Sequence, residues 1–155
     1  MTPLTKGIAV AAFDCLLMLS VAGKYYLDRE RLPRVWAQAT PVDPNLPVRG
    51  RYVSLRVQVE TPAQPHEAIS RARLVIRDGR LAAERVGYWT GVIVDWPGQI
   101  REPVAFFISE HVQDPSRIGS GEELWVEVSV PAQGPPRPLR LGVKKDGVLT
   151  PLAMR

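Results

Sequence analysis

The chain is poor in the side chains that most often bind metals or catalyse reactions. Its 155 residues include one cysteine and two histidines. A single cysteine excludes an intrachain disulfide and a Cys-based metal site, and neither His66 nor His111 has a ligand cluster at metal-binding spacing. No glycine-rich loop of the phosphate-cradling type follows a predicted strand. The sequence therefore predicts no metal, no cofactor and no catalytic motif.

A strong charge imbalance is also missing. The net charge is +4, carried mainly by arginines that are scattered along the chain. Scattered arginines are typical of a solvated surface rather than of a nucleic-acid interface, so we expect no nucleic-acid partner. The alternative is a cytoplasmic, Arg-mediated nucleic-acid binder, whose binding would fall steeply with salt.

One long apolar run is present near the N-terminus. Seventeen residues separate Lys6 from Lys24, and Tyr25, Tyr26 and Leu27 extend the run. At about 1.5 Å per residue, about 20 helical residues cross a hydrocarbon core of about 30 Å. Tyrosines suit the membrane interface. Residues 1–27 are therefore predicted to form a single membrane anchor helix.

Asp14 lies near the middle of this run and makes its insertion marginal. A central aspartate costs about 3 kcal/mol in a membrane helix, which offsets most of the gain from the apolar residues. At 100° per residue, Asp14 shares one side of the helix with Gly7, Ala11 and Met18. Small residues let helices approach closely, and a membrane carboxyl usually needs a partner. We expect these four residues to contact a polytopic membrane protein.

Two other readings of the N-terminal segment stay open. Ser20, Val21 and Ala22 form an acceptable signal-peptidase cleavage site, although Asp14 and the weakly charged start argue against a signal peptide. A buried helix of a soluble protein is the other alternative. Positive charges follow the segment more than they precede it, and this count alone would place the remainder of the chain in the cytoplasm.

The rest of the chain predicts a tether and one β-rich domain. Pro33, Pro41, Pro44 and Pro47 hold the chain extended, so residues 28–47 are interpreted as a Pro-rich tether. Residues 48–155 suit one compact domain by length.

Strand and turn signals recur through this domain. Apolar residues alternate over 52–60, and Asp-Gly turn dipeptides stand at 78–79 and 146–147. Further strands are predicted at 73–77, 80–85, 88–96, 104–108, 124–130, 139–143 and 148–152. About eight short strands with regular turns predict a mainly β fold, either an antiparallel β-sandwich or a partly open β-barrel.

A short motif lies at the start of the domain. Pro41, Asp43 and Pro44 form a Pro-Val-Asp-Pro element, and Gly50, Tyr52 and Leu55 follow it at fixed spacing. This pattern resembles the signature of the GDYXXLXY family, in which Gly-Asp-Tyr-x-x-Leu-x-Tyr follows Pro-Val-Asp-Pro. The resemblance extends more loosely over most of the chain. Arg51 stands where the family has Asp, and Val57 where it has the last Tyr.

The resemblance implies a protein anchored in a bacterial inner membrane, with its β-domain on the extracytoplasmic side. Members of the family are often encoded near polytopic membrane proteins. The motif has a structural interpretation, because Gly50 suits a turn or bulge and Leu55 suits the core. Together with the N-terminal helix, the resemblance predicts a membrane-anchored accessory or binding module that acts with a polytopic membrane protein.

Two enzyme alternatives to this prediction stay open. Glu110, His111 and Asp114 form the one local cluster of acids and imidazole, which would suit a hydrolase. The arrangement of helix, Pro-rich segment and Gly-x-Tyr-Val strand is similar to the entry to type I signal peptidases. No serine stands just before Pro44, and Lys144 and Lys145 lie near the C-terminus, so such a domain would be catalytically inactive.

Large aromatic residues are the remaining candidates for a binding surface on the domain. The domain has many large aromatic residues for its size, among them Tyr88, Trp89, Trp96 and Trp125. The alternation of apolar and polar residues does not place all of them in the core. Exposed aromatics near arginines are favoured at protein interfaces. The sequence predicts that some of them form a docking patch, while others pack in the core.

Overall fold

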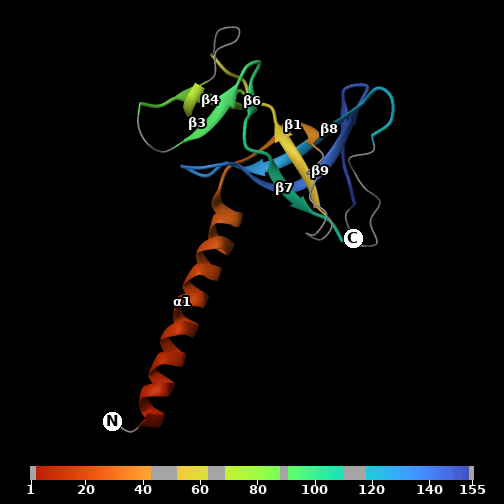
Figure 1. Cartoon of the computed structure of the whole chain (residues 1–155). Helices are drawn as coiled ribbons and strands as arrows, with labels where there is room; N and C mark the ends of the chain where they lie inside the picture. The colour runs from red at the N-terminus through yellow and green to blue at the C-terminus, as the bar shows by residue number, and fades with distance from the viewer. Residues whose placement is uncertain (1–2, 43–51, 63–68, 88–90, 110–117, 154–155) are drawn as a thin grey trace. The chain divides into compact units, whose positions relative to one another are not determined.

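The computed structural model describes residues 3–42, 52–62, 69–87, 91–109 and 118–153. The chain divides into two compact units, Met1–Leu32 and Pro33–Arg155. The first is a single helix and the second is built from strands (Figure 1). The predicted mainly β fold with an N-terminal apolar helix is therefore confirmed.

Helix α1 covers Pro3–Arg31. Within it, Leu4–Asp28 is long and apolar enough to cross a membrane, and none of that stretch is buried. A signal sequence meets the same requirement of length and composition. The helix ends one turn later than predicted, just before Leu32 and Pro33, because the residue preceding a proline is disfavoured in the α region.

The interpretation of residues 28–47 as a tether is wrong for residues 28–42. Residues 28–31 complete α1, and Arg34–Val42 form strand β1. This strand pairs with β8 (Glu122–Ser129) through Gln38 and with β2 (Tyr52–Val57) from Ala39 onward. Pro41 is tolerated in β1, because the hydrogen-bonded ladder with β8 ends before it. The missing N–H of the proline therefore leaves no hydrogen bond to β8 unmade. Residues 43–47 lie outside the described part.

The larger of two antiparallel sheets has six strands. Their order is β10 (Val148–Pro151), β9 (Arg137–Lys145), β8, β1, β2 and β7 (Val104–Phe107). Strand β1 is thus central, although it is the first strand in the sequence.

The smaller sheet has four strands, in the order β4 (Arg80–Arg85), β3 (Ile69–Arg77), β5 (Val92–Asp95) and β6 (Gln99–Ile100). The chain after β2 joins the two sheets, because Gln58 bridges to Gln99 and Glu60 bridges to Ala82. The described chain holds ten strands where the sequence predicted about eight. Strands β1 and β6 are the two that were missed. Strand β5 covers Val92–Asp95 of the predicted strand 88–96, of which residues 88–90 lie outside the described part.

Both predicted Asp-Gly turns connect hairpins. Asp78 and Gly79 have φ values of 50° and 74°, and Asp146 and Gly147 have 50° and 82°. Positive φ at both central positions is the type I′ arrangement, whose twist matches that of the flanking strands. The turns therefore set the register of β3 with β4 and of β9 with β10.

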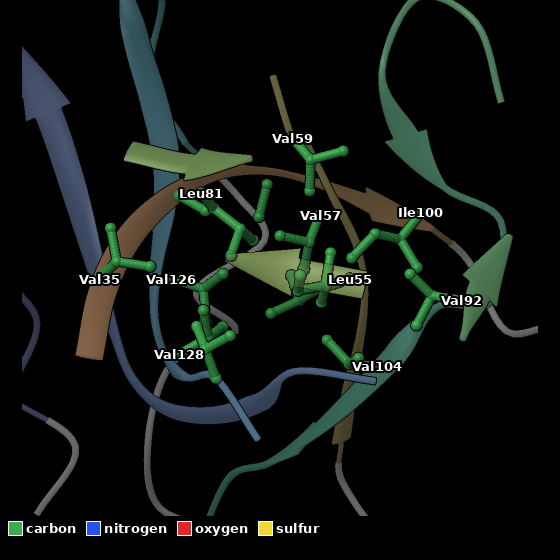
Figure 2. Close-up of a cluster of buried hydrophobic side chains, with 14 of the residues drawn as sticks. Val35, Leu55, Val57, Val59, Leu81, Val92, Ile100, Val104, Val126 and Val128 are labelled. Atoms are coloured by element: carbon green, nitrogen blue, oxygen red, sulfur yellow. The ribbon is translucent and has the colours of Figure 1, made fainter. Parts of the chain in front are cut away.

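The core lies between the two sheets. Figure 2 shows side chains from both of them, among them Leu55, Val126 and Ile100, gathered in one cluster. As the alternation over 52–60 predicted, Val53, Leu55, Val57 and Val59 are all buried. Most members of the cluster are valine, leucine, isoleucine or alanine, so its cohesion comes from burial of aliphatic surface.

Replacing a central core residue tests this arrangement. Leu55 is 0% exposed, so Leu55→Ala leaves a cavity and is expected to lower the free energy of unfolding by about 3 kcal/mol. Val148→Ala, at a residue that is 66% exposed in edge strand β10, is the matched control, with an expected change within about 0.5 kcal/mol. Chemical denaturation measures both values. Equal losses for the two variants would contradict the assigned core.

A charged pair closes the β5–β6 hairpin. Arg101 donates hydrogen bonds of 3.0 and 2.7 Å from Nε and Nη2 to the Asp95 carboxylate. These hydrogen bonds are the main reason why the pKa of Asp95 lies below that of an ordinary aspartate, and burial opposes them. The pair supports the hairpin when the carboxylate is charged.

Because the pKa of Asp95 is lowered, the stability of the hairpin depends on pH. An unfolded aspartate titrates near pH 4, so the pair's contribution is complete above about pH 5 and is lost as pH falls through the lower folded pKa. Asp95→Asn is expected to be slightly less stable than the wild type at pH 7 and to lose less stability between pH 5 and pH 2. Denaturation midpoints across this range measure the difference. Parallel curves for the two proteins would contradict the role of Asp95.

Candidate binding groove

The outer face of the six-stranded sheet carries two tryptophans. Along β1, Val35 and Ala37 face the core, and Trp36 and Gln38 point to the other side. The register places Gln38 opposite Trp125 of β8 and Trp36 opposite Glu127. Both indole side chains are half-buried. Pairing of β1 with β8 thus brings together aromatics that stand far apart in the sequence.

Neighbouring residues hold both rings. A Cβ atom on Gly142 of β9 would lie 3.0 and 3.2 Å from two carbons of the Trp36 ring, so this glycine makes room for the indole. The Trp125 indole N–H donates a 3.0 Å hydrogen bond to Glu123. The Lys144 ammonium lies 4.6 Å from the centre of the Trp125 ring, within the range of a cation–π contact.

A nearly buried carboxylate lies on the same face, opposite Trp36. Glu127 is only 7% exposed and accepts hydrogen bonds of 2.6 and 3.1 Å from Arg140. The same guanidinium lies 5.9 Å from the centre of the Trp36 ring. Hydrogen bonding to Glu127 raises the pKa of Arg140. A carboxylate so poorly solvated needs such a partner, so Arg140 is held in place beside Trp36.

A groove of about 580 Å³ opens beside these rings. The outer sides of β1, β8 and β9, the segment that follows β2 and the β3–β4 turn form its walls. The volume is in the range of small-molecule sites. We call this hollow the Trp groove and define it by the polar and aromatic residues of its lining, which are Trp36, Gln38, Gln58, Glu60, Asp78, Arg80, Glu123, Trp125 and Lys144.

Among the described residues that line the groove, Arg80 and Glu60 form an ion pair. Arg80 donates a 2.8 Å hydrogen bond to Glu60, and this bond is the main reason why the pKa of Arg80 is raised. Both side chains are largely exposed, so the pair adds little stability. Its effect is positional, because it connects the β3–β4 turn to the segment that joins the two sheets.

The structure places some residues of the predicted motif together. Pro41 of β1 lies opposite Leu55 of β2, and Leu55 is fully buried. The Tyr52 ring lies 6.0 Å from that of Phe107 in β7. Asp43, Pro44 and Gly50 lie outside the described residues.

The other predicted site residues are spread over the chain. Gly7, Ala11, Asp14 and Met18 are all exposed on α1. Glu110, His111 and Asp114 lie outside the described residues, as do Tyr88 and Trp89. Of the predicted aromatic patch, Trp125 lies in the Trp groove, while Trp96 lies in the β5–β6 turn and does not line it.

Sequence reasoning missed Trp36, Gln38 and Gln58. The signal that would have found the first two is the alternation over 34–40, in which Val35, Ala37 and Ala39 are buried. Comparisons with protein families, with curated proteins and with solved structures found no match. The Trp groove is therefore interpreted from the chemistry of its own side chains.

A methyl group at Gly142 tests how the Trp36 ring is held. In Gly142→Ala the new Cβ crowds the ring and also lies 3.1 Å from the Thr150 carbonyl oxygen. We expect a shifted indole, a changed near-ultraviolet circular dichroism spectrum and a loss of about 1–2 kcal/mol in stability. Gly87→Ala, where nothing lies within 4 Å of the added Cβ and φ is not in the left-handed region, is the control for an added methyl group that meets no neighbour. An unchanged spectrum in Gly142→Ala would contradict the packing.

Proposed function

We propose that the protein is a single-pass, membrane-anchored binding module of the bacterial inner membrane that acts with a polytopic membrane protein. In this proposal α1 pairs with a helix of the partner, and the β-domain lies on the extracytoplasmic side. The observation that carries the proposal is Asp14. It is the only charged residue between Lys6 and Lys24, in a helix whose apolar stretch contains no buried residue.

The energetics of Asp14 favour a partner. In lipid, a central aspartate costs about 3 kcal/mol unless it finds a hydrogen-bonding group. Gly7, Ala11 and Met18 lie on the same side of α1, and small side chains allow a second helix to approach the carboxyl group. Contact with a partner helix would therefore stabilise both the insertion and the complex.

The β-domain suits recognition. The Trp groove presents indole rings, amides and carboxylates on a rigid sheet, which are groups that orient a ligand. The resemblance to the GDYXXLXY family supports an anchored module with a polytopic partner, and it is the reason for choosing the extracytoplasmic side. Pro41 and Leu55 of the two motif elements lie opposite each other in neighbouring strands, which supports a structural role for the motif.

Co-purification of the tagged full-length protein from mildly solubilised native membranes tests the proposal. We expect reproducible recovery of one polytopic membrane protein. Asp14→Leu is expected to stay in the membrane and to reduce recovery of the partner at least several-fold, since a polar contact between membrane helices contributes about 1–2 kcal/mol.

The matched control is Leu16→Ala, which lies on the opposite side of α1. It is expected to leave recovery of the partner unchanged. Undiminished recovery with Asp14→Leu, or recovery of the tagged protein alone from wild-type membranes, would contradict the proposal.

A further inference from the structure

The Trp groove contains polar groups whose hydrogen-bonding capacity is not used by the protein. The side-chain amides of Gln38 and Gln58 are half-buried, and neither makes a side-chain hydrogen bond within the described part of the chain. Their backbones are joined by a 2.9 Å hydrogen bond, so the two amides are fixed as neighbours. Partly buried amides without a protein partner are groups that a ligand can satisfy.

The charges of the groove are nearly balanced. The lining contains three carboxylates and two basic side chains, which are Glu60, Asp78, Glu123, Arg80 and Lys144. Glu60 and Arg80 form an ion pair with each other. The charged groups left for contact with a ligand are the carboxylates of Asp78 and Glu123 and the Lys144 ammonium. A polyanion would meet the excess of carboxylates, and a polycation would meet Lys144 over the Trp125 ring. The lining therefore favours an uncharged polar ligand.

The pairing of β1 with β8 leaves no place for a peptide strand on that edge of β1. Extended peptides gain most of their binding from the free edge of a sheet. Next to the groove, β1 is already paired with β8 at Trp36 and Gln38, and Gln38 also accepts the backbone hydrogen bond from Gln58. On that edge the groove offers side chains rather than backbone groups for recognition.

The remaining combination is indole rings beside amides and carboxylates. A pyranose ring has an apolar face of C–H groups, which stacks on a flat indole, and a rim of hydroxyl groups. Neighbouring hydroxyls match the paired polar atoms of an amide or a carboxylate. The Lys144 ammonium that lies over Trp125 is borne on a flexible stem, so a stacked ring displaces it without moving the sheet.

We propose that the Trp groove binds a neutral glycan. Trp125 stacks on one pyranose unit, and Gln38, Gln58 and Glu123 hydrogen-bond to its hydroxyl groups. The inference concerns the β-domain alone and goes beyond the anchoring role, so either proposal fails without affecting the other.

The test uses the full-length protein in lipid nanodiscs. An array of neutral oligosaccharides is screened first, with chitotriose, maltotriose and cellotriose included, and each positive ligand is titrated by tryptophan fluorescence and calorimetry. We expect saturable binding of at least one class that is insensitive to salt, because the ligand carries no charge. Trp125→Ala is expected to weaken this binding at least tenfold.

Two further variants separate recognition from folding. Gln38→Leu keeps the approximate shape of the side chain and removes its hydrogen bonds, so it is expected to weaken binding about three- to tenfold, equivalent to about 1 kcal/mol. Trp96→Ala removes an exposed tryptophan that does not line the groove and is expected to leave the affinity unchanged. Circular dichroism checks that each variant is folded.

The outcomes decide the proposal in either direction. Binding that is lost in Trp125→Ala, weakened in Gln38→Leu and retained in Trp96→Ala supports a glycan site in the groove. No saturable binding to any neutral glycan overturns it. Binding that Trp125→Ala and Gln38→Leu both leave intact overturns it as well, and so does binding restricted to charged polymers with a steep salt dependence.

Discussion

The pairing of β1 between β8 and β2 is the constraint on which the rest of the structure depends. Strand β1 is the first strand in the sequence and a central strand in the sheet. Its inward side chains Val35, Ala37 and Ala39 belong to the core, and its outward side chains Trp36 and Gln38 line the Trp groove. A single strand therefore contributes both to stability and to the candidate binding surface.

The same pairing limits the link between the two units. Only Leu32 and Pro33 separate the end of α1 from the start of β1, and two extended residues span at most about 7 Å. The chain thus passes from α1 to β1 within two residues. If α1 is an anchor, as we propose, the strand that builds the groove begins almost directly after it.

The sequence predicted the features that depend on local chemistry. Asp78 with Gly79 and Asp146 with Gly147 identified two hairpins, because these pairs adopt positive φ readily. Alternation over 52–60 identified the buried face of β2. Strand β1 was missed for two reasons. Pro33 and Pro41 indicate an extended tether, and the small side chains of Ala37 and Ala39 give only a weak apolar signal. Pro41 is compatible with the strand only because β8 has stopped pairing there, which is a tertiary fact.

The Trp groove could not be predicted from local sequence patterns either, because it also depends on tertiary pairing. Trp125 was singled out as a large aromatic, but its neighbours Gln38 and Trp36 come from β1, and Arg80 comes from the β3–β4 turn. These residues meet through strand order and register, which periodicity does not reveal. The sequence pattern also gives no sign of the role of Gly142, whose lack of a side chain makes room for the Trp36 ring. Long-range pairing thus determines the site, whereas local signals determine the elements.

Hydrogen exchange of the backbone amides in residues 34–40 of the full-length protein tests the central role of β1 most directly. The amides that donate to the ladders with β8 and β2 are predicted to exchange as slowly as those in the interior of β8, because they are hydrogen-bonded within a central strand of the sheet. Exchange over the whole of this segment at the rate of an unstructured peptide would show that it is a tether and would contradict both the sheet order and the Trp groove.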